Sequence, residues 1–222
     1  MSRSKTPYAE TWKGAPFCLA AFALWLIGSA VVSVFSGEVG TTGRIAIQHV
    51  TGIVLLAPLF LLHSKRLSGI SLRGSASRRD YIVGVSVVVS LYAVSELIEW
   101  AQGIPLEPWL SFVTEASAPQ LIIISFLVIF IAPISEELAF RHFLLAAMPY
   151  KRGALYAAAT VVAGALVFMS LHSYAFWVTN ALMFMLAVVF AVARIKTGGL
   201  LLPIVLHSTA GTIGLTIILL KS

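Results

Sequence analysis

Seven stretches of the sequence each carry close to twenty predominantly apolar residues, and they constrain the fold more than any other feature. They cover residues 16–35, 45–62, 81–98, 120–147, 153–171, 174–194 and 199–220. An apolar run of ~20 residues is long enough to cross a bilayer as a helix. Because no water reaches the backbone there, each crossing segment must satisfy its own N–H and C=O groups. We predict an all-α fold, a polytopic membrane helix bundle of about seven (six to eight) transmembrane helices, in a single domain over residues 1–222.

The composition and charge pattern favour a membrane protein over a soluble or nucleic-acid-binding one. Charged residues make up 11% of the chain, whereas globular domains carry about 25%. The net charge of +6 comes largely from residues before the first stretch and from the connections 63–80, 148–153 and 194–198. By the positive-inside rule these segments are cytoplasmic. We therefore expect an integral protein of a bacterial or archaeal inner or cell membrane, with its N-terminus in the cytoplasm and the lipid bilayer, not nucleic acid, around it.

The fourth stretch keeps charges at a depth where charge is costly. Residues 131–143 read IAPISEELAFRHF, and ionisable residues inside spans usually face a cavity or a partner. Glu137 and Arg141 lie four residues apart, so we predict that they pair on one helix face. Glu136 is rotated by about 100° from Glu137 and is predicted to remain available as an acid or base. His142 receives no role, and the stretch is long enough to break near Pro133.

Two histidines on later stretches extend this polar set. His172 lies in VFMSLHSYAF and His207 in LLPIVLHSTAG, whereas His49, Glu96 and Glu99 are weaker members. A carboxylate and two imidazoles can position and deprotonate a water for amide hydrolysis. Glu136, His172 and His207 could equally bind zinc as a two-histidine, one-carboxylate site with an open position. The residue types alone leave both arrangements open.

The predicted depths of these side chains agree only in part. Counted along straight helices, His207 lies ~13 Å and Glu136 ~21 Å from the cytoplasmic side, both near mid-membrane. His172 lies ~30 Å along its own helix. The three residues can therefore meet only if the fifth stretch is tilted or starts within the membrane.

Three short motifs follow one another along residues 120–215, each on its own predicted span. They are Glu136-Glu137-x-x-x-Arg141 (EExxxR), Phe168-x-x-x-His172 (FxxxH), and His207 preceded by Pro203. In this order they resemble the motifs of the CPBP family of intramembrane proteases. That family includes CAAX prenyl endopeptidases and bacteriocin-processing and abortive-infection proteins.

The resemblance implies hydrolysis of a peptide bond in a membrane-anchored peptide or protein, within a helix bundle that holds a polar intramembrane cavity. Carried over by position, Glu136 would be the general base that activates water, assisted by His172. His207 would polarise the scissile carbonyl or stabilise its oxyanion, and Glu137 and Arg141 would organise the site. We favour a metal-free glutamate mechanism without a cofactor, with zinc on Glu136, His172 and His207 as the alternative.

The last motif departs from the family pattern. The family usually has HxxxN or HxxxD, but the fourth residue after His207 is Gly211. Loss of one oxyanion-hole donor typically lowers the rate by roughly 10²–10³. Candidate substitutes are the amide of Asn180 and the hydroxyls of Ser208, Thr209 and Thr212. Asn180 could instead serve as a hydrogen-bonding residue between helices.

Two other functions remain open at the level of the sequence. A non-catalytic immunity or scaffold protein of the same fold could keep the polar cluster as a clamp between helices. An ion-coupled transporter could use buried glutamate and histidine as relays, although the small number of spans and the lack of an internal repeat argue against it.

Overall fold

The structure is a computed structural model that describes residues 14–37, 39–64, 71–172 and 174–222, and these residues contain helices and no strands. The longer helices are α1 (Ala15–Phe35), α2 (Thr41–Leu62), α3 (Arg78–Gln102), α5 (Ala118–Phe126), α8 (Ala154–Ser170), α9 (Trp177–Thr197) and α10 (Leu201–Lys221). Short helical pieces are η3 (Pro108–Leu110), α4 (Ser111–Thr114), α6 (Ala132–Glu136), α7 (Leu145–Ala147) and η6 (Tyr150–Arg152). Two π-helical segments, η4 (Leu127–Ile131) and η5 (Glu137–Leu144), join α5, α6 and α7 into one rod.

The predicted membrane helix bundle is confirmed. Among the described residues, six helical units are long and apolar enough to span a membrane: α1, α2, α3, the rod Ala118–Ala147, α9 and α10. The fifth predicted span corresponds to α8, an apolar helix of only 17 residues. The basic residues Arg3, Lys5, Lys13, Lys65 and Arg66, on which the predicted orientation partly depends, lie outside the described residues.

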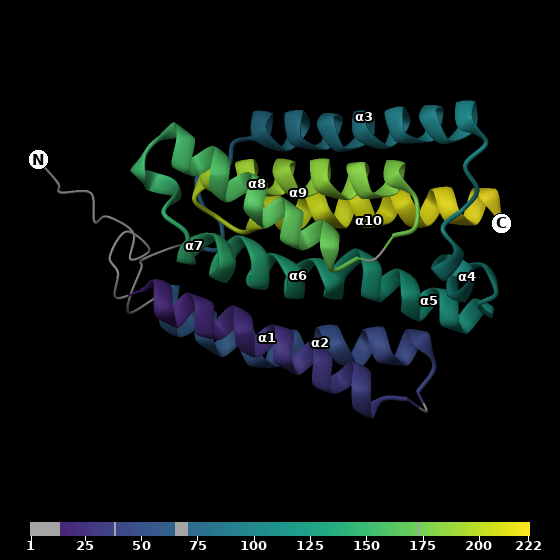
Figure 1. Cartoon of the computed structure of the whole chain (residues 1–222), viewed down its shortest axis with the longest axis horizontal. Coiled ribbons are helices and arrows are strands. Elements are labelled where there is room, and N and C mark those ends of the chain that lie inside the picture. The colour runs from purple at the N-terminus through teal and green to yellow at the C-terminus, as the bar shows by residue number, and fades with distance from the viewer. Residues whose placement is uncertain (1–13, 38, 65–70, 173) are drawn as a thin grey trace, which may run out of the picture.

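The helices are arranged around the central rod (Figure 1). The α1–α2 hairpin packs on one side of it, α8, α9 and α10 lie on the other, and α3 packs against α9 and α10. The connections around residues 71–77, 148–153 and 198–200 lie at the same end of the bundle. There the backbone N–H of Ser75 donates to the Thr197 carbonyl at 2.8 Å. The basic connections thus share one end, as predicted, whereas its assignment to the cytoplasm remains a prediction.

One part of the predicted loop set is wrong. Arg194 and Lys196 lie inside α9, which extends to Thr197, and not in a connection. Arg194 is buried, and its Nε donates to the carbonyl of Arg141 at 3.1 Å. Lys196 is exposed and pairs with Asp80 at 2.7 Å. Arg194 and Lys196 therefore differ in burial, because the arginine side chain reaches a backbone acceptor on η5, whereas the lysine side chain reaches the surface.

The central rod does not break near Pro133. Proline has no N–H to donate and its ring clashes with the carbonyl four residues earlier in an α-helix. The π-helical turn of η4 ends two residues before Pro133 and widens the helix there, so the rod continues. The second π segment, η5, begins at Glu137. π-helical turns occur often at functional sites, and here one carries the EExxxR motif.

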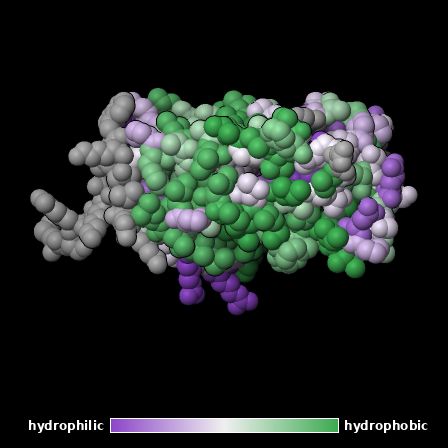
Figure 2. All heavy atoms as spheres, turned by 90° about the horizontal axis from the view of Figure 1, so that it is seen from below, coloured by the Kyte–Doolittle hydropathy of each residue, from purple (hydrophilic) through white to green (hydrophobic). Residues whose placement is uncertain are grey.

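The outer face of the α1–α2 hairpin is apolar (Figure 2). Hydrophobic side chains cover most of the middle of this face, and hydrophilic ones gather at the right end of the view and project from its lower edge. Exposed residues on these helices include Ile27, Val31 and Val54. An exposed apolar surface of this extent is expected to contact lipid tails, in agreement with an integral membrane protein.

The hairpin is fastened to the rod at the residue directly before Glu136. Trp25 Nε1 on α1 donates to Ser135 Oγ at 3.2 Å, and both residues are buried. On α2, a Cβ atom at Gly52 would collide with Ser135 Oγ and would lie 2.7 Å from Trp25 Nε1. Only glycine therefore lets α2 approach the rod at this level.

This close contact predicts different effects of the same substitution at two helical glycines. Gly52→Ala should lower the free energy of unfolding by ~1–3 kcal/mol because the added methyl group overpacks the α2–α6 contact. Gly164→Ala on α8 should be neutral or stabilising, by up to ~1 kcal/mol, because a Cβ there meets nothing within 4 Å. Unfolding of both purified variants in detergent measures the difference, and equal stability of the two would contradict the packing argument.

Candidate active site

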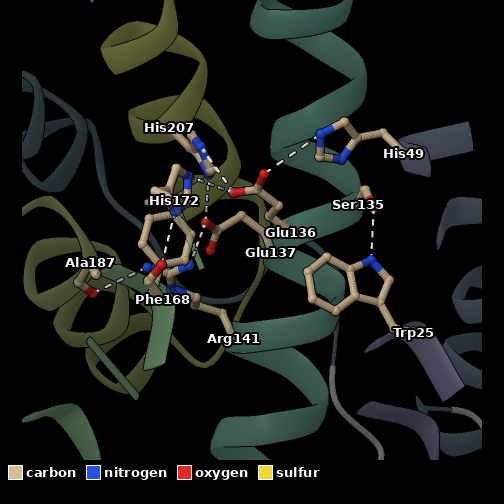
Figure 3. A network of polar contacts seen from close by, with 10 residues as sticks. All are labelled: Trp25, His49, Ser135, Glu136, Glu137, Arg141, Phe168, His172, Ala187 and His207. Atoms are coloured by element: carbon tan, nitrogen blue, oxygen red, sulfur yellow. Dashed lines mark hydrogen bonds and ion pairs between the residues drawn. The ribbon is translucent and has the colours of Figure 1, made fainter. Parts of the chain in front are cut away.

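Glu137 and Arg141 form the buried ion pair that the sequence predicts (Figure 3). Arg141 Nη1 lies 3.1 Å from Glu137 Oε1, and both side chains are shielded from solvent. Arg141 Nη2 also donates to the carbonyl of Ala187 on α9 at 3.2 Å. The guanidinium carbon lies 4.6 Å from the ring centroid of Phe168 and 5.2 Å from that of Phe190. A buried charge is tolerable only when it is paired and hydrogen-bonded, and this arginine has both kinds of partner.

His207 connects the two adjacent glutamates. Its Nδ1 lies 2.9 Å from Glu137 Oε1, and its Nε2 lies 3.7 Å from Glu136 Oε2. Since a carboxylate accepts at Nδ1, that nitrogen carries a proton and the ring orientation is fixed. The ring also stacks on Phe190, with centroids 5.0 Å apart. Glu137 therefore orients both His207 and Arg141. The sequence predicted the contact with Arg141 but not the one with His207.

Among the described residues, Glu136 has no lysine or arginine paired with it and faces imidazoles instead. The Nε2 atoms of His207, His49 and His172 lie 3.7, 3.8 and 4.0 Å from its carboxylate oxygens. These distances exceed the ~2.7–3.2 Å of a direct hydrogen bond. Among the described residues Glu136 Oε2 has no hydrogen-bond partner, although the residue is only 9% exposed. The predicted catalytic residues Glu136, His172 and His207 thus converge, and their roles remain predictions.

The predicted depth conflict of His172 is resolved by the course of α8. Figure 1 shows α8 inclined against α9, and the helix ends at Ser170, directly before the turn that carries His172. His172 Nδ1 lies 2.8 Å from the carbonyl of Phe168, so Nε2 is the nitrogen that faces Glu136. Phe168, one turn earlier, packs against both His172 and the Arg141 guanidinium. The FxxxH spacing therefore places Phe168 and His172 on the same side of the site.

Glu107 holds the segment next to His172, a role that the sequence analysis did not predict. This buried carboxylate accepts the backbone N–H of Ala175 at 2.8 Å and of Phe176 at 3.0 Å. A carboxylate at the start of a helix satisfies N–H groups that have no partner within the helix, and these two precede α9. The partners are 68 and 69 residues apart in the chain, so no local pattern connects them.

Asn180, predicted as a substitute oxyanion donor, has its amide nitrogen engaged. Nδ2 donates to the carbonyls of Tyr174 at 2.9 Å and Phe176 at 2.8 Å. The hydroxyls of Thr209 and Thr212 donate to carbonyls of α10 itself. Asn180 therefore stabilises the turn before α9 in this arrangement, and its role as an oxyanion donor remains a prediction.

Gly211 stands at a close contact between α10 and the rod. A Cβ atom at this position would lie 2.7 Å from the Val128 carbonyl oxygen and 3.1 Å from Val128 Cγ1. Val128 belongs to η4. The contact with the Val128 backbone thus leaves no room for the asparagine side chain of the HxxxN pattern at position 211. The same contact holds His207, one turn earlier on α10, near Glu136.

Of the weaker candidates from the sequence, His49 lies at the candidate active site, whereas Glu96 and Glu99 do not. His49 on α2 reaches Glu136 from the side opposite His172 and His207 (Figure 3). Glu96 and Glu99 pair with Lys221, at the far end of α3. The unassigned His142 is buried beside His63, with Nε2 2.8 Å from His63 Nδ1.

The residues do not fit a zinc site as they are placed. A tetrahedral site needs nitrogen and oxygen ligands ~2.0–2.2 Å from one common point. No group of three or more His, Cys, Asp or Glu residues in the described part of the chain could hold a metal ion. The Nε2 atoms of His207 and His172 both lie on the Oε2 side of Glu136, 3.7 and 4.0 Å from that oxygen. The absence of a cofactor remains a prediction.

Comparison with known proteins identifies the family of this chain. The family model described as type II CAAX prenyl endopeptidase Rce1-like matches residues 118–213, which include all three motifs. The chain belongs to the CPBP family. Membership in the CPBP family indicates an intramembrane protease of the CAAX type that acts on peptides within a lipid bilayer, and it does not favour the scaffold or transporter alternatives.

A similar protein occurs in Escherichia coli. This uncharacterized 24.3 kDa protein is 30% identical over 173 residues, which cover 76% of the chain and 78% of the relative. No solved structure matches the chain.

Restoring the usual CPBP asparagine at position 211 should harm the protein. Gly211→Asn forces α10 away from Val128 and His207 away from Glu136, so both the melting temperature and the cleavage rate should fall. Gly211→Ala should show the same losses to a smaller degree, since overpacking grows with side-chain size. Thermal unfolding and a peptide-cleavage assay in proteoliposomes measure these effects. A Gly211→Asn protein that cleaves faster than wild type would contradict the packing explanation.

The Glu137–Arg141 pair should show the asymmetry of buried ion pairs. Arg141→Met leaves the Glu137 carboxylate buried without its cation and should lower the free energy of unfolding by ~3–5 kcal/mol. The double variant Arg141→Met, Glu137→Met removes both charges and should regain part of that stability. Denaturation in detergent measures both variants. If the double variant is the less stable one, the interpretation of the pair is wrong.

Proposed function

We propose that this protein hydrolyses a peptide bond in the tail of a membrane-anchored protein or peptide, with Glu136 as the general base. One observation carries the proposal. Of the two adjacent glutamates, Glu137 is held by Arg141, whereas Glu136 faces imidazole nitrogens at 3.7–4.0 Å inside a membrane span. A buried carboxylate without a fixed cation is expensive to keep, and proton transfer is a reason to keep it.

The separation of Glu136 and His172 suits a shared water. Glu136 Oε2 and His172 Nε2 lie 4.0 Å apart, and a gap beyond 3.5 Å between polar atoms can be bridged by water. Glu136 removes a proton from this water as its oxygen attacks the carbonyl carbon of the scissile bond. The C–N bond of the tetrahedral intermediate then breaks, and Glu136 returns the proton to the leaving amine.

His207 faces the same space with its second nitrogen. Because Nδ1 is bonded to Glu137, Nε2 is the nitrogen left to face the substrate carbonyl. In the imidazolium form, with a proton on both ring nitrogens, His207 would donate from Nε2 and stabilise the negative charge that develops on the carbonyl oxygen. Glu137 and Arg141 act indirectly, since they fix the position of His207 and of the π-helical turn that carries Glu136.

The family supports a proposal for the substrate class. The matching family model is that of type II CAAX prenyl endopeptidases. We propose a protein or peptide with a prenylated C-terminal CAAX tail as the substrate, anchored in the same bilayer. The apolar lipid-facing surface of the bundle is compatible with a substrate that arrives through the membrane.

Cleavage of labelled prenylated CAAX peptides in proteoliposomes tests the proposal. Glu136→Gln should lower kcat by roughly 10³ or more, and His172→Ala and His207→Ala by roughly 10²–10⁴ each, as expected for loss of an acid–base group or an oxyanion donor. Each variant should be compared with wild type for folding by thermal unfolding and gel filtration in detergent. Undiminished cleavage by folded Glu136→Gln protein would overturn the proposal.

The same assay separates the metal-free mechanism from the zinc alternative. Removal of divalent ions with a chelator should leave the wild-type rate unchanged, because no proposed step uses a metal. A chelator-sensitive rate that returns on addition of Zn²⁺ would refute the metal-free part and leave the assignment of Glu136 as a site residue standing.

A further inference from the structure

We propose that His49, which belongs to none of the three motifs, is a positioning residue of the active site. It holds one oxygen of Glu136, so that the other oxygen alone faces the reacting water. The inference rests on the proposed function of Glu136 as the base, and it adds a fourth helix, α2, to the catalytic centre.

The two oxygens of Glu136 have different surroundings. Oε1 lies 3.8 Å from His49 Nε2, whereas Oε2 lies 3.7 Å from His207 Nε2 and 4.0 Å from His172 Nε2. Figure 3 shows His49 on one side of the carboxylate and the two motif histidines on the other. A movement of about 1 Å brings His49 Nε2 to hydrogen-bond distance of Oε1. An N–H donated there stops rotation of the carboxylate and leaves Oε2 directed at the water.

The chain contains a local arrangement that brings α2 to this place. Gly52 lies three residues after His49, so the two residues share one face of α2. The absent side chain at Gly52 lets that face touch Ser135 and Trp25, and the Trp25–Ser135 hydrogen bond fixes the contact. Ser135 directly precedes Glu136. The close approach at Gly52 therefore determines how far His49 stands from the carboxylate.

The hydrogen bonding of His49 does not fit a residue kept only for packing. Its side chain is 12% exposed, and buried polar groups in folded proteins nearly always have hydrogen-bond partners. Its Nδ1 atom is buried and has no such partner among the described residues. Its Nε2 faces the Glu136 carboxylate, with Oε1 at 3.8 Å. Contact with Glu136 thus accounts for a polar ring at a position that an apolar side chain could fill.

Held orientation matters here because Glu136 lacks a direct hydrogen bond from either motif histidine. A catalytic group that must find its orientation in each turnover loses rate, since fixed geometry supplies a large part of enzymatic acceleration. Removal of His49 should therefore lower kcat and leave KM nearly unchanged, because His49 does not touch the substrate.

Three substitutions of His49 separate positioning from packing. His49→Leu fills the space without a donor, His49→Gln places an amide N–H at a similar reach, and His49→Asn carries the same amide on a shorter side chain. Steady-state cleavage in proteoliposomes gives kcat and KM, and thermal unfolding reports folding. Gln48→Leu, at the neighbouring position rotated by about 100° on the same helix, is the matched control and should keep the wild-type kcat.

We expect His49→Leu and His49→Asn to lower kcat by roughly tenfold or more with KM within about twofold of wild type, and His49→Gln to recover most of kcat. Wild-type kcat in folded His49→Leu protein would overturn the inference. So would equal losses in the glutamine and asparagine variants, because these indicate a packing role. If Glu136→Gln abolishes cleavage while the His49 variants do not, only this inference fails. If Glu136→Gln cleaves normally, the proposed function fails first.

Discussion

The buried ion pair between Glu137 and Arg141 is the interaction on which the rest of the site depends. Arg141 is tied to α9 through the Ala187 carbonyl, and Glu137 is tied to α10 through His207. Three spans are thereby fixed relative to one another at mid-bundle. Because Arg141 is paired with Glu137, the adjacent Glu136 remains without an arginine partner. The charges in the fourth span thus divide into a structural pair and a reactive carboxylate.

Close helix contacts supply the remaining geometry. The rod that carries Glu136 is approached on one side by α2 at Gly52 and on another by α10 at Gly211. Each glycine lies three or four residues beyond a histidine that faces Glu136, namely His49 and His207. In a bilayer, where lipid tails are as apolar as the helices, small residues that allow close approach are a main source of helix association. These two contacts therefore serve stability and also set the distances in the site.

Features that depend on local sequence could be predicted, and features that depend on distant segments could not. The lengths of the apolar stretches gave the bundle, and the spacing of four residues gave the Glu137–Arg141 pair. His172 lies near Glu136 only because α8 is inclined. This inclination results from the packing of α8 against other helices and cannot be predicted from the sequence of α8 alone. Glu107 and Arg194 bind backbone groups on other elements, so their roles become visible only once those elements are packed.

Gly211 shows what a comparison of motifs leaves out. Judged against the HxxxN pattern, it is a lost donor and suggests a weakened enzyme. In the structure it is the position where α10 meets the Val128 carbonyl, and a side chain there does not fit. The close contact at Gly211 thus excludes the asparagine of the usual motif in this arrangement, and His49 on the opposite side of Glu136 is a polar group that the motif does not include.

The division of roles between the two adjacent glutamates is the central claim, and a paired measurement of stability and turnover on Glu136→Gln and Glu137→Gln tests it most directly. Both substitutions remove one charge from neighbouring positions of the same helix. The account predicts that Glu136→Gln unfolds at or near the wild-type temperature and does not cleave. It predicts that Glu137→Gln unfolds at a clearly lower temperature, because Arg141 is left buried without its partner. Equal unfolding temperatures for the two variants, or cleavage retained by Glu136→Gln, would contradict it.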